Sequence, residues 1–60
     1  MNHLALTTSR SRVDSGAASC EALGWTLMFT DRHPRAGGPA HYAALLVDDD
    51  GYELELVAAD

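Results

Sequence analysis

Residues 48–57 read Asp-Asp-Asp-Gly-Tyr-Glu-Leu-Glu-Leu-Val, and this stretch decides the expected fold of the 60-residue chain. The aspartates and Gly51 predict a tight turn, because glycine takes positive φ freely and aspartate side chains accept hydrogen bonds from nearby amides. Polar and apolar residues then alternate over residues 52–58. The alternation predicts a strand with leucines on one face and glutamates, including Glu55, on the other.

Three further strands are expected upstream of this turn. Residues 3–8 and 25–30 alternate with period two, and residues 41–47 are mainly apolar. Residues 31–40 contain both prolines and a pair of glycines, a composition typical of a loop. The last three strands follow one another along the chain, so we expect them to form an antiparallel meander.

A helix is expected between the first two strands, capped by Ser9 or Ser11 and ending near Leu23, with Gly24 as its stop. Gly16 and several serines make this a weak helix on its own, so it needs to pack against the sheet. Its thin apolar stripe consists of Val13, Ala17, Cys20 and Leu23.

The chain is therefore expected to be a single βαβββ module over residues 1–60, of the α+β class, with a four-stranded mixed sheet and one covering helix. One helix covers one face only, so the face that carries His3 and Glu55 is expected to be bare. It must be solvated or buried against a second module or subunit. Such a short chain has a small core, and Cys20, the lone cysteine, cannot form an internal disulfide.

Charge and hydropathy exclude several classes of function. A net charge of -5 argues against a nucleic-acid partner, which would require a basic patch. The longest purely apolar run, residues 43–47, is far shorter than the roughly 20 residues that span a membrane. The first residues lack the charged segment of a secretory signal. We therefore expect a cytoplasmic protein with no nucleic-acid or membrane partner.

Four segments resemble the vicinal oxygen chelate superfamily, which includes glyoxalases, bleomycin-resistance proteins and extradiol dioxygenases. They are residues 3–6 (HLAL), 23–25 (LGW), 41–46 (HYAALL) and 48–57 (DDDGYELELV). The family turn reads Asp-Pro-Asp-Gly-Asn, and here Asp49 replaces the proline and Tyr52 the asparagine; both changes keep a turn. The resemblance covers nearly the whole chain and is to the C-terminal module of a two-module protein.

The resemblance implies a metal site. In the family, the first and last strands of a module each donate one ligand, and these positions are His3 and Glu55 in this chain. Their nitrogen and oxygen donors suit a divalent ion such as Zn, Ni, Mn, Co or Fe. Two protein ligands are too few for a tight site, so the resemblance also implies a homodimer or a second module that completes it.

The function implied is metal-dependent chemistry on a small oxygen-chelating substrate, with Glu55 as the catalytic base in a glyoxalase-like lyase. A dioxygenase would need a second histidine from the partner module. Two alternatives stay open: a metal-free small-molecule binding protein similar to bleomycin-resistance proteins, and an inactive half-domain fragment. Whether the chain belongs to an enzyme is left undecided.

Four other residues carry polar or reactive groups that bear on the site or the core. His41 and Tyr42 fall on opposite faces of a strand, so one of them is expected to border the site, although a polar strand end is the simpler interpretation. His33 lies in the loop and is expected to point to solvent; the alternative is that it binds an anionic ligand together with Arg35. Cys20 is expected to be an inert thiol in the core.

Overall fold

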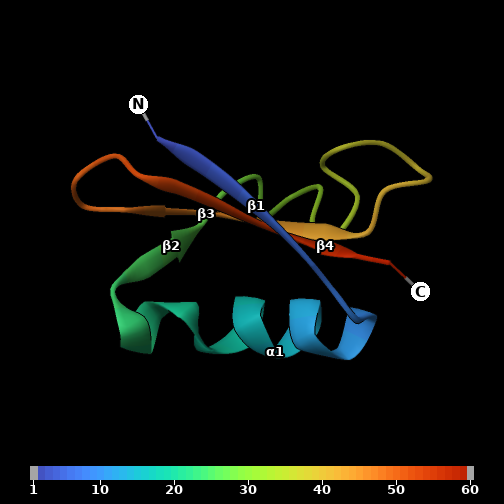
Figure 1. The fold of residues 1–60 in the computed structure, drawn as a ribbon, viewed down its shortest axis with the longest axis horizontal. Coiled ribbons are helices and arrows are strands. Elements are labelled where there is room, and N and C mark those ends of the chain that lie inside the picture. Colours follow the sequence, from blue (N-terminus) through green and yellow to red (C-terminus); the bar gives the residue numbers. More distant parts are fainter. Residues whose placement is uncertain (1, 60) are drawn as a thin grey trace.

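A computed structural model describes residues 2–59 of the chain (Figure 1). The elements are, in order, β1 (His3–Thr8), α1 (Arg10–Ser19), the 3-10 turn η1 (Cys20–Leu23), β2 (Trp25–Leu27), β3 (Ala43–Asp48) and β4 (Glu53–Ala58). This order confirms the predicted α+β fold of the βαβββ type. None of the helices in the described part of the chain is long and apolar enough to cross a membrane.

The four strands form one mixed sheet in the order β1-β4-β3-β2. β4 pairs antiparallel with β3, and β3 pairs antiparallel with β2, which confirms the predicted meander. β1 pairs parallel with β4, so that Ala5 lies opposite Glu55. The first and last strands of the chain are therefore neighbours in the sheet.

The turn between β3 and β4 forms as the sequence predicts. The side chain of Asp48 accepts hydrogen bonds from the backbone amides of Asp50, at 3.0 Å, and of Tyr52, at 2.9 Å. Gly51 has φ of 84°, a conformation that costs glycine little. These local bonds fix the register of the hairpin.

The helix begins and ends at predicted residues. Ser9 is the N-cap, and its hydroxyl accepts a hydrogen bond from the backbone amide of Arg12 at 3.3 Å. Gly24 ends the helical segment in the left-handed conformation, with φ of 87°. The last turn, η1, is 3-10 rather than α.

Two predicted strands are wrong in extent. β2 ends at Leu27 and not at residue 30, because Phe29 has φ of 55° and so leaves the extended conformation. β3 begins at Ala43 and not at residue 41. The backbone amide of His41 donates to the carbonyl of Gly38 within the loop, a turn-like bond, and not to a neighbouring strand.

The helix packs on one face of the sheet, which we call the covered face; Ala44 and Leu46 of β3 lie on it (Figure 1). Gly16 allows the close approach, since a Cβ at this position would lie 2.7 Å from Cδ1 of Leu56. The glycine that weakens the isolated helix therefore permits its packing. The buried cluster on this face consists of Val13, Cys20, Ala44 and Leu46.

The opposite face, which we call the open face, carries His3, Leu45 and Glu55 and was expected to be bare. The loop of residues 28–42 rises on this side of the sheet (Figure 1). Ala43, which alternates with Ala44 and so belongs to the open face, is only 1% exposed. The loop therefore covers one corner of the open face, and the expectation of a wholly bare surface is wrong.

Candidate functional site

The carboxylate of Glu55 lies between two imidazole rings. Its Oε1 is 3.4 Å from Nε2 of His3, and its Oε2 is 2.8 Å from Nε2 of His41. The side chain of Glu55 is 19% exposed, compared with 46% for His3 and 36% for His41. This group of three side chains, partly open to solvent, is the candidate site.

The parallel register of β1 and β4 brings His3 to Glu55. Ala5 lies directly opposite Glu55, and His3 is two residues away on the same face of β1. A histidine at this distance reaches the carboxylate diagonally across the two strands. The structure thus places together the two residues that the sequence proposed as metal ligands.

His41 arrives from the loop and not from a strand. Its ring packs against Gly37, where an added Cβ would lie 3.0 Å from the ring Cγ and closer still to Cδ2. Sequence reasoning expected either His41 or Tyr42 to border the site but favoured a plain strand end for both. The sequence feature that could have identified His41 as a site residue is the pair Gly37-Gly38 shortly before it, because glycine leaves space for the imidazole ring.

The distance between the first two donors suits a shared ion. Two ligands bound at about 2.1 Å in a tetrahedral arrangement lie about 3.4 Å apart. Nε2 of His3 and Oε1 of Glu55 have this separation, 3.4 Å. An imidazole nitrogen and a carboxylate oxygen are both common ligands of divalent metals in proteins, so the two residues fit such an ion.

One chain offers too few donors for a complete site. Among residues 2–59, no three histidine, cysteine, aspartate or glutamate side chains are grouped so that they could hold an ion together. The two imidazoles approach different oxygens of one carboxylate, and Nε2 of His41 is engaged with Oε2. Catalytic zinc sites have three protein ligands, so His3 and Glu55 need at least one more.

Tyr42 points away from this group. Its hydroxyl donates a hydrogen bond to the carboxylate of Asp14 on α1. The guanidinium groups of Arg10 and Arg35 lie 4.8 and 5.1 Å from the centre of its ring. The hydrogen bond to Asp14 raises the pKa of Tyr42 above the ordinary value of 10.0, because the bond holds the phenol proton. Tyr42 thus connects the loop to the helix.

The other singled-out residues lie outside the site. Cys20 is buried, and its thiol donates to the carbonyl of Ala17 at 3.4 Å, as suits a core position. His33, in the same loop as His41, has intermediate exposure. The contacts described for the Glu55 carboxylate are with His3 and His41, not with His33.

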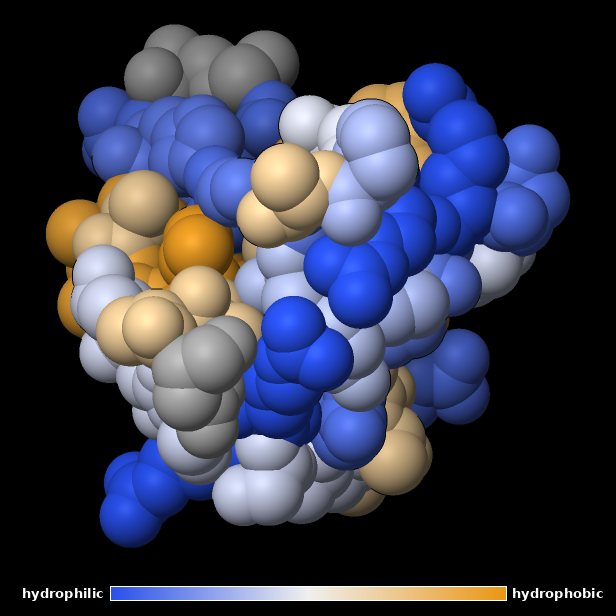
Figure 2. Space-filling view, turned by 90° about the vertical axis from the view of Figure 1, so that its right-hand side faces the viewer, coloured by the Kyte–Doolittle hydropathy of each residue, from blue (hydrophilic) through white to orange (hydrophobic). Residues whose placement is uncertain are grey.

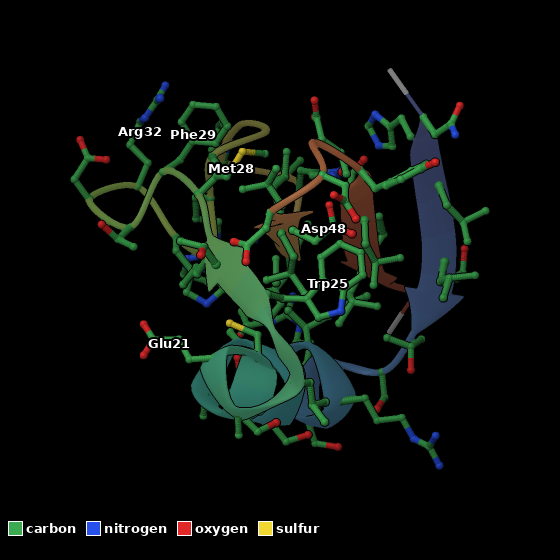
Figure 3. The ribbon with its side chains drawn as sticks, turned by 90° about the vertical axis from the view of Figure 1, so that its left-hand side faces the viewer. Glu21, Trp25, Met28, Phe29, Arg32 and Asp48 are labelled. Carbon is green, nitrogen blue, oxygen red and sulfur yellow. The ribbon has the colours of Figure 1, made fainter. Side chains whose placement is uncertain are left out.

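An apolar cavity of about 430 Å³ lies on the covered face beside β1. Leu4 and Leu6, which line it, are 58% and 46% exposed because α1 does not extend over them. Figure 3 shows the Trp25 indole directed from β2 toward β1, above the helix. Figure 2 shows that hydrophobic residues gather along one side of the molecule, beside a largely hydrophilic surface. Of the three residues of the candidate site, His3 lines this cavity, whereas Glu55 and His41 do not.

The comparisons with known proteins point to a glyoxalase-like fold. No protein-family model matches the chain. Over 59 residues it is 42% identical to "Uncharacterized protein YqjT" of Bacillus subtilis (strain 168), covering 97% of this chain and 46% of that protein. The crystal structure of a "putative glyoxalase" from Bacillus halodurans superposes with a TM-score of 0.85 and 41% identity, covering 97% of this chain and 44% of that one. The chain thus has a glyoxalase-like fold and spans less than half the length of both proteins.

Proposed function

We propose that the chain is one module of a glyoxalase-like, metal-dependent protein of the vicinal oxygen chelate superfamily. The observation that carries this proposal is the pair His3 and Glu55, whose nitrogen and oxygen donors lie 3.4 Å apart on the open face. The fold likeness to a protein described as a glyoxalase supports it. The substrate class is a small molecule that binds the ion through two adjacent oxygens, and the ion is Zn, Ni, Mn, Co or Fe(II).

A second module or a second copy of this chain completes the proposed site. His3 and Glu55 supply two ligands, fewer than a catalytic site needs. The chain spans less than half the length of the two proteins that it resembles, which leaves room in such proteins for a second module. A partner seated on the open face would also cover the exposed part of β1 there, including Ala5 and Thr7.

The ion, when bound, polarises the substrate oxygens as a Lewis acid. His3 offers Nε2 as a ligand, which requires its ring proton to be on Nδ1. Glu55 holds Oε1 toward His3, while Oε2 accepts the hydrogen bond from His41. Glu55 would hold the ion through Oε1 and, once released from it, would act as the general base, accepting at that oxygen a proton from a substrate carbon.

A metal-free binding protein is the second candidate. One observation favours it: each oxygen of Glu55 has an imidazole partner within the same chain, so the carboxylate is accommodated without an ion. In that case the carboxylate and the two rings form one wall of a groove for a small ligand.

Metal titration of matched glutamate variants tests the proposal. We expect the wild-type chain to bind Zn²⁺ or Ni²⁺ in isothermal titration calorimetry, and Glu55→Gln to lower the affinity at least tenfold, because the amide is a poorer ligand. Glu53→Gln is the control, since it removes the same charge from the same strand. Absence of binding by a wild-type chain that sedimentation shows to be dimeric, or equal loss in both variants, would contradict the metal site.

A further inference from the structure

We infer that His41 is a positioning residue, which fixes the Glu55 carboxylate so that its free oxygen faces His3 and the ion. This inference rests on the proposed function. The two rings approach opposite oxygens of one carboxylate, His3 at Oε1 and His41 at Oε2. The shorter contact, 2.8 Å, is a full hydrogen bond, whereas the 3.4 Å contact is too long to be a strong one.

The position of the ring proton decides which of the two histidines can bind the ion. An ionised carboxylate only accepts hydrogen bonds, so Nε2 of His41 must carry the proton that it donates to Oε2. A protonated ring nitrogen has no lone pair for a metal. His41 therefore holds the ligand, and the Nε2 lone pair of His3 is the one available to the ion.

The loop is shaped to seat the His41 ring. Gly37 lies against it, and any side chain at this position would overlap ring atoms. The φ angle of Gly37 is not in the left-handed region, unlike that of Gly38, so space and not backbone conformation requires glycine here. The backbone amide of His41 also donates to the carbonyl of Gly38 at 3.1 Å, which fixes the residue at the base of its side chain.

Hydrogen bonds to ligating carboxylates affect metal affinity strongly, and removing such partners costs about 10–100-fold. We therefore expect His41→Ala to weaken Ni²⁺ or Zn²⁺ binding by about 10–100-fold in calorimetric titrations of the whole chain. His41→Gln keeps an N–H donor but is a poor metal ligand, so it should retain most of the affinity. His33→Ala removes a histidine from the same loop and should leave the affinity unchanged.

Gly37→Ala tests the same hydrogen bond without changing any polar group. It should lower the affinity about as much as His41→Ala, because the methyl group displaces the ring. Adding Gly37→Ala to His41→Ala should cause no further loss, since no ring remains to be displaced. Long-range ¹H–¹⁵N spectra provide an independent readout: they should show Nε2 of His41 protonated, both with and without the ion.

The possible results distinguish failure of the proposed function from failure of the inference about His41. A dimeric wild-type chain that binds neither ion overturns the proposed function, and the inference with it. Metal binding that His41→Ala leaves unchanged overturns the inference alone. A loss in His41→Gln as large as in His41→Ala also overturns it, because hydrogen bonding would then not be the role of the ring. An additive loss in the double variant, or an unprotonated Nε2 of His41, has the same effect.

Discussion

The two faces of the sheet differ in what their side chains do, although the same strands supply both. On the covered face, Leu46 is 3% exposed and packs under the helix. On the open face, Glu55 lies one residue from a leucine on either side and is 19% exposed between two histidines. Because successive side chains of β3 and β4 point to opposite faces, the residues that stabilise the fold lie on one face and those of the candidate site on the other.

The largest expected effect compares adjacent leucines on β3. Leu46→Ala removes a buried side chain from a small core and should lower the free energy of unfolding by about 2–5 kcal/mol. Leu45→Ala changes the same residue type on the open face, where burial is only partial, and should cost about 1–2 kcal/mol. Urea unfolding followed by circular dichroism measures both.

Equal losses in the two leucine variants would break the contrast between the faces. They would mean that the open face is as well covered in solution as the helix side. A loss for Leu45→Ala that grows with protein concentration would instead sharpen the comparison, because it would indicate that a second copy covers this face.

A smaller effect is expected at the contact between helix and sheet. Gly16→Val places a branched side chain where even a Cβ would lie 2.7 Å from Leu56 Cδ1, and overpacking of this kind costs about 1–3 kcal/mol. Ala18→Val, on the exposed side of the same helix, is the control and should cost well under 1 kcal/mol. Chemical denaturation distinguishes them; a neutral Gly16→Val would show that α1 can shift away from β4 without loss.

The smallest effect concerns the bond from Tyr42 to Asp14, which joins the loop to the helix. The pKa of Tyr42 is raised above 10.0 by this bond, so the folded chain keeps the phenol proton at a pH where the unfolded chain loses it. The contribution is present below about pH 10 and disappears as the pH rises through the raised pKa. Tyr42→Phe should therefore be slightly less stable than wild type at pH 8 and should lose less stability between pH 9 and 11.

Unfolding curves across this pH range provide the measurement, and Tyr52→Phe on the exposed turn is the control. If Tyr42→Phe and wild type lose stability in parallel above pH 9, the hydrogen bond contributes nothing to the folded state.

The parts of the fold that sequence predicted are those that short-range chemistry determines. Ser9 caps the helix, Gly24 ends it and Gly51 turns the chain, because each acts on amides and carbonyls within a few residues. The parallel pairing of β1 with β4 is not local, and it was not predicted from the sequence. This pairing brought His3 and Glu55 to the same place.

The path of the loop could not be predicted in the same way. Phe29 leaves the extended conformation after only three strand residues, and Pro34 accepts a hydrogen bond from Ala43 across the loop. Such contacts depend on where the sheet already lies, which no local pattern in residues 31–40 encodes. His41 consequently looked like a strand end, although its ring reaches Glu55.

The neighbouring positions of the first and last strands also affect how the protein is made. Within this segment His3 is synthesised well before Glu55, yet the two side chains meet across β1 and β4. A nascent chain that stops before β4 has the histidine but not the carboxylate. The two side chains of the candidate site are therefore present together only once this segment has been translated through β4.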